Sequence, residues 1–117
     1  MNKEDLKRRT KDYALRLIKL VGSLPKTQEG RIVGDQLLRS GTSTAANYRA
    51  ACRARSKAEF IAKLGTVIEE SDESLFWLEI IIESGIMKKE LVESLLKETN
   101  EIISIMVTTR KSTINNK

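Results

Sequence analysis

The sequence predicts an all-α protein that folds as an up-down-up-down antiparallel four-helix bundle. Three observations support this fold: the 117 residues include only six glycines and one proline, 32% of them are charged, and the apolar residues recur at helical spacing. A single domain over residues 1–117 is expected, because domains commonly contain about 100–150 residues. Four helical segments are separated by short loops, so neighbours along the chain should pack antiparallel.

The first helix is expected at about residues 4–23. Asn2 is a suitable N-cap because Asp5 follows three residues later, and Pro25 ends the segment since proline cannot continue a helix. A rotation of about 100° per residue places an apolar face around Leu17. That face also holds Leu6, Tyr13, Leu20, Val21 and Leu24.

The second helix is expected at about residues 27–54, with Thr27 as its N-cap. Its middle, residues 40–43, consists of poor helix formers, so the helix either breaks there or continues with a kink. We expect a continuous, bent helix, because residues 45–54 favour the helical state and no proline or long polar loop intervenes.

The third helix has the clearest start, and is expected at about residues 57–84. Ser56 and Glu59 have the spacing of a capping box, and Gly85 is suited to the position that follows a helix end.

The fourth helix is expected at about residues 88–111, followed by a frayed tail at residues 112–117. Its apolar face is expected to hold Leu91, Leu95, Thr99, Ile102 and Met106.

The absence of histidine and the single cysteine exclude several classes of site. Hydrolases that activate serine or cysteine with histidine need that residue, and so do di-iron bundles with Glu-x-x-His motifs. Zinc fingers and intrachain disulfides need more than one cysteine. Cys52 has no second thiol beside it and is expected to be a small buried side chain. We therefore expect no enzymatic activity, no metal and no cofactor.

No segment indicates export or membrane insertion. Residues 1–9 are not followed by the apolar stretch of a signal peptide. The most apolar run, residues 75–82, is interrupted by Glu79, whereas a membrane span needs about 20 apolar residues. The sequence favours a cytoplasmic protein without a membrane partner.

An acidic cluster in the third helix has two interpretations. It consists of Glu69, Glu70, Asp72 and Glu73. Paired carboxylates can bind a hard cation or transfer protons, but the fourth helix offers few facing ligands. We favour a structural interpretation, in which Glu69 and Glu73 lie four residues apart and pair with a buried arginine. The other two carboxylates then face solvent.

The arginine is expected from the polar middle of the second helix, as Arg39 or Arg49. The stretch at residues 39–43 lacks the pattern of a phosphate-binding P-loop. Its small residues, Gly41 among them, favour close packing of two helices, with Asn47 hydrogen-bonded across the contact. The expected structural polar network is Arg39, Asn47, Glu69 and Glu73.

Positive charge is concentrated in the first half of the chain. Residues 1–57 contain 14 Lys and Arg against 5 Asp and Glu, and residues 58–117 contain 7 against 11, so the half-chain charges are +9 and −4. Basic clusters bind phosphates without reading base sequence, although a solvated face or attraction between the two halves would also explain them. The candidate nucleic-acid-binding residues are Arg8, Lys11, Arg49, Arg53 and Arg55.

Apolar side chains outside the expected core predict self-association. Leu15 and Ile18 lie away from the apolar face of the first helix, and the third helix is apolar on two sides through its second half. A ring-like homo-oligomer with a heterologous contact would bury these surfaces. The candidate interface residues are Leu15, Ile18, Phe76, Trp77 and Ile80.

Several strings of the chain resemble one protein family. Residues 36–51 read Gln-Leu-Leu-Arg-Ser-Gly-Thr-Ser-Thr-Ala-Ala-Asn-Tyr-Arg-Ala-Ala, and further similar pieces follow at residues 60–64, 69–74 and 77–78. In this order they resemble the four-helix bundle proteins known as 23S ribosomal RNA intervening-sequence proteins. Ala50 departs from the glutamate of the family pattern.

The resemblance implies a homopentamer and kinship with the accessory variability determinant of diversity-generating retroelements, which binds nucleic acid and a reverse transcriptase. It implies no enzymatic activity. The expected partners are further copies of the chain, RNA or DNA, and a reverse transcriptase-like protein. We expect a non-enzymatic oligomer with weak, largely sequence-independent nucleic-acid binding, and the alternative is a protein–protein scaffold or accessory subunit without a nucleic-acid role.

Overall fold

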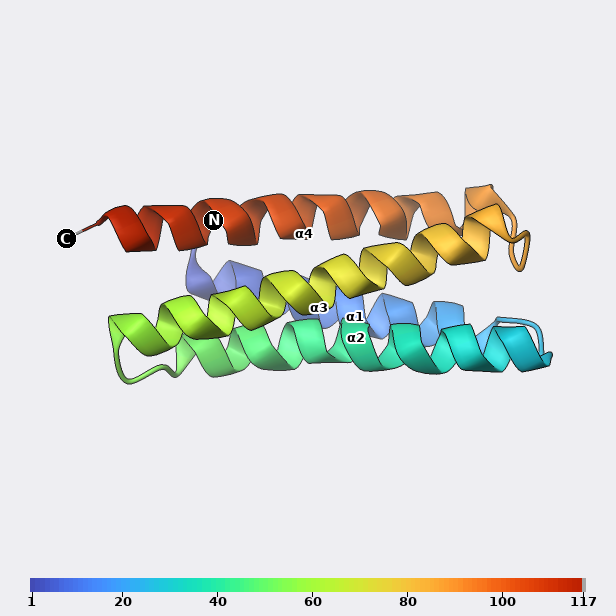
Figure 1. The fold of residues 1–117 in the computed structure, drawn as a ribbon, viewed down its shortest axis with the longest axis horizontal. Helices are drawn as coiled ribbons and strands as arrows, with labels where there is room; N and C mark the ends of the chain where they lie inside the picture. Colours follow the sequence, from blue (N-terminus) through green and yellow to red (C-terminus); the bar gives the residue numbers. More distant parts are fainter. Residues whose placement is uncertain (117) are drawn as a thin grey trace.

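The computed structural model describes residues 1–116 and confirms the predicted all-α fold with four helices. These are α1 (Lys3–Gly22), α2 (Gln28–Cys52), α3 (Lys57–Glu83) and α4 (Lys89–Asn115). They run antiparallel in chain order and form a rod of 50 × 20 × 19 Å, with the start of α1, the end of α4 and the α2–α3 loop toward one end (Figure 1). Across the described residues, every helix is too short or too polar to cross a membrane.

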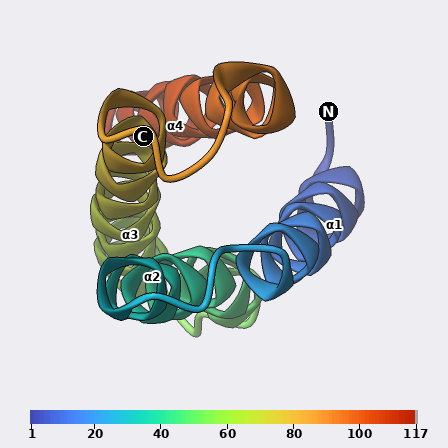
Figure 2. The ribbon, with the colours of Figure 1, turned by 90° about the vertical axis from the view of Figure 1, so that its right-hand side faces the viewer.

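The four helices follow one another around the bundle axis, as the end-on view shows (Figure 2). The most extensive packing joins α2 to α3, and α3 to α4 and α1 to α2 come next. Helices α1 and α4 pack much less extensively against each other. The bundle is therefore least tightly closed between its first and last helices.

The helix ends follow the local sequence signals. Asn2 accepts a hydrogen bond from the backbone amide of Asp5 at 2.8 Å, and the Asp5 carboxylate accepts one from the amide of Asn2 at 3.3 Å, which completes the predicted capping box. Thr27 caps α2 as expected. After α3, Gly85 adopts φ of 76°, a conformation that glycine accepts at little cost.

The predicted capping box before α3 forms only in part. The Ser56 hydroxyl accepts a hydrogen bond from the backbone amide of Glu59 at 3.1 Å. The Glu59 carboxylate, however, accepts from the amide of Arg55 at 3.3 Å and not from that of Ser56.

Two segments with weak helical propensity are helical in the structure. Helix α2 continues without a break through residues 40–43, where the hydroxyls of Ser40 and Thr42 donate to backbone carbonyls one turn earlier. The prediction of a frayed tail at residues 112–117 is wrong for residues 112–115, which belong to α4, and residue 117 lies outside the described residues. There the ammonium group of Lys57 donates to the carbonyl of Asn116 and ties the tail to the start of α3.

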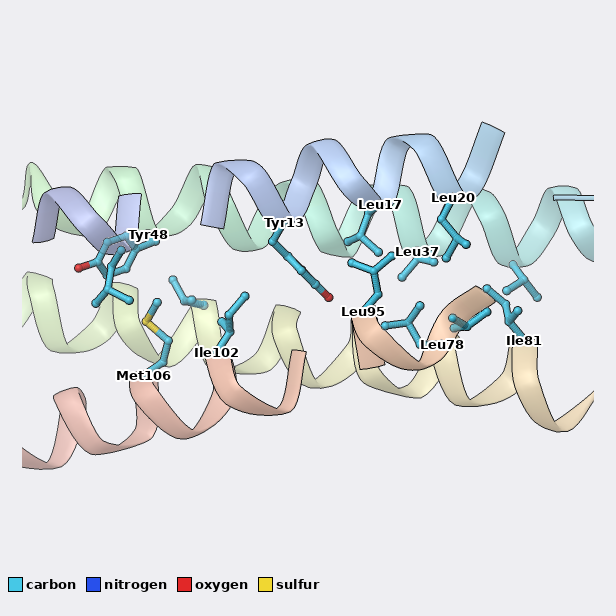
Figure 3. Packing of buried hydrophobic residues seen from close by; sticks show 14 of the residues in the cluster. Tyr13, Leu17, Leu20, Leu37, Tyr48, Leu78, Ile81, Leu95, Ile102 and Met106 are labelled. Carbon is cyan, nitrogen blue, oxygen red and sulfur yellow. The ribbon is translucent and has the colours of Figure 1, made fainter. Parts of the chain in front are cut away.

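The core is a continuous apolar cluster along the bundle axis (Figure 3). It includes Tyr13 and Leu17 from α1, Leu37 and Tyr48 from α2, Leu64, Val67, Leu78 and Ile81 from α3, and Val92, Ile102 and Met106 from α4. The predicted position of Leu91 in this core is wrong, because its side chain is 62% exposed. Val92 is buried instead, and it begins the alternating spacing of three and four residues that an inward-facing stripe requires.

Buried hydroxyl groups connect the helices inside this core. The Tyr13 hydroxyl bonds to that of Thr99 at 2.6 Å, which links α1 to α4, and the Ser74 hydroxyl donates to that of Ser40 at 2.8 Å, which links α3 to α2. Burial raises the pKa of Tyr13 to about 12, so its phenol stays neutral at physiological pH. Every buried polar side-chain atom in the described part of the chain has a partner.

Candidate nucleic-acid interface

Four basic side chains line an open groove where α2 passes into α3. We call it the basic groove, and its cations are Arg49, Arg53, Arg55 and Lys63. Ala46 and Ala50 form its small apolar part, and its volume is about 420 Å³. Because α2 residues three and four positions apart share a face, this helix presents two arginines and two alanines to the same groove.

The basic groove has a strong excess of positive charge. Glu59 is the one carboxylate among its lining residues, and that carboxylate already accepts a hydrogen bond from the backbone amide of Arg55. Within residues 1–116, none of the four groove cations lies within ion-pair distance of a carboxylate. The groove therefore offers unneutralised cations to an anionic ligand.

Only three of the five predicted nucleic-acid-binding residues meet in this groove, namely Arg49, Arg53 and Arg55. Arg8 lines a different depression, between α1 and α4, together with Asp5, Asp12 and Glu98. Lys11 is exposed on α1 and lines neither depression. Lys63 was not a candidate from sequence, although its position four residues after Glu59 places it on the same face of α3.

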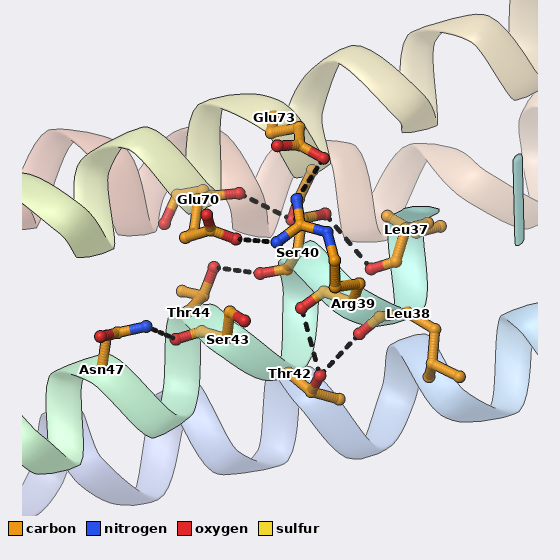
Figure 4. A network of polar contacts seen from close by, with 12 residues as sticks. Leu37, Leu38, Arg39, Ser40, Thr42, Ser43, Thr44, Asn47, Glu70 and Glu73 are labelled. Carbon is orange, nitrogen blue, oxygen red and sulfur yellow. Dashed lines mark hydrogen bonds and ion pairs between the residues drawn. The ribbon is translucent and has the colours of Figure 1, made fainter. Parts of the chain in front are cut away.

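The predicted arginine–glutamate network exists in part (Figure 4). Arg39 pairs with Glu73 as predicted, but its second partner is Glu70, which was expected to face solvent. Arg39 donates to Glu70 at 3.0 Å and to Glu73 at 2.5 Å. The prediction of a pair with Glu69 is wrong, because Glu69 is exposed and lies about 100° around the helix from Glu70. The side chain of Arg39 is itself 48% exposed, so the expectation of a buried ion is also wrong.

Glu73 and Asn47, two further residues of the predicted network, lie on α3 and α2 respectively. The hydrogen bond from Arg39, aided by one from the indole of Trp77 at 3.2 Å, holds the pKa of Glu73 below its ordinary value. Asn47 does not bond across the helix contact, since its amide donates to the carbonyl of Ser43 in its own helix at 2.9 Å. Its side chain faces the preceding turn of α2 rather than α3.

The least exposed ion pair among the described residues joins α1 to α4, and it was not predicted from the sequence. Arg9 donates twice to Glu98, at 2.7 Å from each of two nitrogens, and once to Glu101 at 3.0 Å. The side chains of Arg9 and Glu98 are only 22% and 17% exposed. The paired hydrogen bonds from Arg9 lower the pKa of Glu98. This clamp bridges the two neighbouring helices that otherwise pack least against each other.

The five candidate interface residues divide into two groups. Leu15, Ile18 and Phe76 are 54%, 47% and 50% exposed, respectively. Trp77 and Ile80 are half-buried and pack against the core, and the Trp77 ring meets that of Phe76 edge-on at 4.9 Å. The exposed apolar surface on α3 is therefore centred on Phe76.

Two further expectations from the sequence concern Cys52 and metal binding. Cys52 is half-buried rather than fully buried, and it packs against the core at the end of α2. In the part of the chain that the structure describes, no three Cys, Asp or Glu side chains gather as a metal-ligand set.

Comparison with known proteins supports one family. The family model described as 23S rRNA-intervening sequence protein matches residues 3–108. The chain is also similar to a solved structure, that of a protein with unknown function from the S23 ribosomal protein family of Bacteroides thetaiotaomicron. The two chains are 33% identical with a TM-score of 0.88, and the alignment covers 95% of this chain and 99% of that chain. No curated protein matches the chain significantly.

Proposed function

The chain belongs to the family of 23S rRNA-intervening sequence proteins, and we propose that it is a non-enzymatic protein that binds the phosphate backbone of nucleic acid, RNA in particular. The observation that carries this proposal is the basic groove, where Arg49, Arg53, Arg55 and Lys63 line one depression without ion-pair partners among the described residues. The family match also confirms the resemblance noted in the sequence.

The chemistry of the groove favours backbone contacts over base recognition. Guanidinium and ammonium groups donate hydrogen bonds to phosphate oxygens, and neutralising those phosphates releases condensed counterions. Among residues 1–116, no aromatic side chain and no amide side chain that could read a base edge lines the groove. Binding is therefore expected to depend on charge rather than on sequence.

The proposal is tested by the salt dependence of RNA binding, measured by fluorescence anisotropy with labelled single strands of unrelated sequence. Four phosphate contacts per subunit predict that the logarithm of the affinity falls against the logarithm of the salt concentration with a slope of about −3 per groove. All sequences should bind about equally. Absence of binding at low salt would contradict the proposal and favour the scaffold alternative.

We also propose that the chain assembles as a homo-oligomer through its exposed apolar side chains. Leu15 and Ile18 lie on α1 and Phe76 on α3, and α2 separates these two helices. Two unlike patches on different helices suit a heterologous contact, which closes into a ring when the rotation between subunits permits. A ring would repeat the basic groove and strengthen binding through multivalency.

Light scattering of the purified protein tests this assembly. We expect a mass that is a multiple of the 13.2 kDa chain, five times that value for the pentamer that the family resemblance implies. Leu15→Glu combined with Ile18→Glu should lower the mass to that of one chain while circular dichroism stays helical. A parent protein that scatters as a 13.2 kDa species at micromolar concentration would disprove the assembly.

A further inference from the structure

A second cavity lies at the end of the bundle, next to the basic groove. We call it the end cavity, and each helix contributes to its wall, with Leu6 from α1, Tyr48 and Cys52 from α2, Phe60 from α3 and Thr109 from α4. Its volume is about 510 Å³, within the range of about 300–1,000 Å³ that is usual for small-molecule sites. Tyr48 is buried at this end of the core, as Figure 3 shows.

The end cavity combines an apolar wall with a positively charged rim. Lys3, Arg55 and Lys57 contribute to its lining, and no Asp or Glu among the described residues does. The ammonium of Lys57 donates to the carbonyl of Asn116, which leaves its other two N–H donors for a ligand. Arg55 lines both the end cavity and the basic groove, so the two depressions are neighbours.

One face of Phe60 borders the solvent side of this cavity. The ammonium of the exposed side chain of Lys3 lies 4.7 Å from the centroid of the Phe60 ring, so a polar group from outside reaches the ring face. The rest of Phe60 packs against the core, which holds the ring in place. A planar aromatic group could stack on this face once Lys3 moves aside, and Lys3 would then be free to contact an anion.

From this arrangement we propose that the end cavity takes one unpaired base of a single-stranded nucleic acid, stacked on Phe60, with the adjoining phosphate on Arg55. The proposal rests on the proposed function, because the strand reaches the end cavity along the basic groove. A base is flat and apolar on its faces, so it suits the apolar wall of the end cavity. The adjoining phosphate is anionic, so it suits the positively charged rim. A duplex keeps its bases stacked and paired, so it can occupy the groove but not the cavity.

The inference predicts a preference for single strands that depends on Phe60. Anisotropy is measured with a labelled, unstructured strand and with the same strand annealed to its complement. The parent protein should bind the single strand about tenfold more tightly than the blunt duplex, since stacking of one base on an aromatic ring has about that effect. Phe60→Leu should remove this preference and leave duplex binding unchanged.

Phe76→Leu is the matched control, because it makes the same change on the same helix about 24 Å from Phe60. It should leave the ratio of single-strand to duplex affinity at the parent value, because any effect of Phe76 on assembly changes both affinities together. Phe60→Trp keeps an aromatic face and should retain the preference for single strands. Thermal unfolding followed by circular dichroism checks that each variant is folded.

Cys52 offers a readout that needs no variant, because it is the one cysteine of the chain and it lines the end cavity. The rate of its alkylation by iodoacetamide should fall when the single strand is bound and stay unchanged when the duplex is bound. Equal protection of Cys52 by the single strand and the duplex would overturn the proposed base site. Protection of Cys52 by a fatty acid, oleate, but not by the strand would overturn it as well.

The measurements separate the two proposals. Equal affinity for strand and duplex, unaffected by Phe60→Leu, would overturn the end cavity as a base site while the basic groove stands. If neither form of nucleic acid binds at low salt, both the groove and the cavity assignments fail.

Discussion

Gly41→Val is expected to destabilise the protein by about 3 kcal/mol, because it forces extra atoms into a packed core. A Cβ atom at position 41 would lie only 2.0 Å from Cδ1 of Leu17, which is wholly buried between α1 and α2. Leu17 would have to leave its rotamer, or the two helices would have to separate. The higher helix propensity of valine offsets only a few tenths of a kcal/mol of this cost. Urea denaturation at a fixed protein concentration measures the change.

Gly65→Val is the matched control, since Gly65 is also inside a helix and a Cβ there would meet only the Nε atom of Arg110, at 3.7 Å. It should change stability by less than about 1 kcal/mol. Leu17→Ala alone should cost about 2–5 kcal/mol through loss of buried apolar atoms. Combined with Gly41→Val, it should cost less than the two changes summed, because the truncated side chain leaves room for the new one.

A Gly41→Val protein as stable as the parent would mean that α1 and α2 do not approach closely at this point. Additive costs in the double variant would indicate that the two side chains do not meet. Either result would contradict the packing of α1 on α2.

The helix starts and turns were predictable because their causes lie within a few residues of the chain. The capping box at Asn2 and the left-handed glycine at Gly85 depend on contacts over three or four positions. The helical tail was not predictable, because its contact between Lys57 and Asn116 joins residues 59 positions apart. Leu91 was misplaced because it and Val92 both fit the spacing of the next apolar residues, and packing chose Val92.

The residues of the candidate site were likewise predictable where they lie close together in the sequence, and their contacts with other helices were not. Arg49, Arg53 and Arg55 lie within seven residues at one helix end, so their common location could be read from the sequence. The acidic partner of Arg39 could not be read from the sequence in the same way. A step of one residue turns a side chain by about 100° around the helix, and the register of α2 against α3 places Glu70, rather than Glu69, within reach of Arg39.

Contacts between helices that are far apart in the sequence could not be predicted from local sequence patterns. The clamp of Arg9 on Glu98 joins residues 89 positions apart. A pair of acidic residues at Glu98 and Glu101, three positions apart on α4, was visible as a signal for a basic partner. Nothing local identified that partner as a residue of α1.

Reversing the charge of the basic groove is expected to abolish most nucleic-acid binding. In the triple variant Arg49→Glu, Arg53→Glu and Lys63→Glu, three of the four groove cations become anions that repel phosphate. We expect the affinity for unrelated RNA strands to fall at least about a hundredfold at low salt. The salt slope should also become shallower by about 2, as three phosphate contacts are lost. Arg55 is kept, so the end cavity retains its own cation.

The matched control reverses three exposed lysines at the opposite end of the bundle, Lys26, Lys88 and Lys89. Each reversal subtracts two charges, so both triple variants have a net charge of −1 instead of +5. If binding depends on the location of the cations, the control should bind RNA within about threefold of the parent, because charges more than a Debye length away are screened. Equal losses in the two variants would show that overall charge governs binding, and the basic groove would then have no special role.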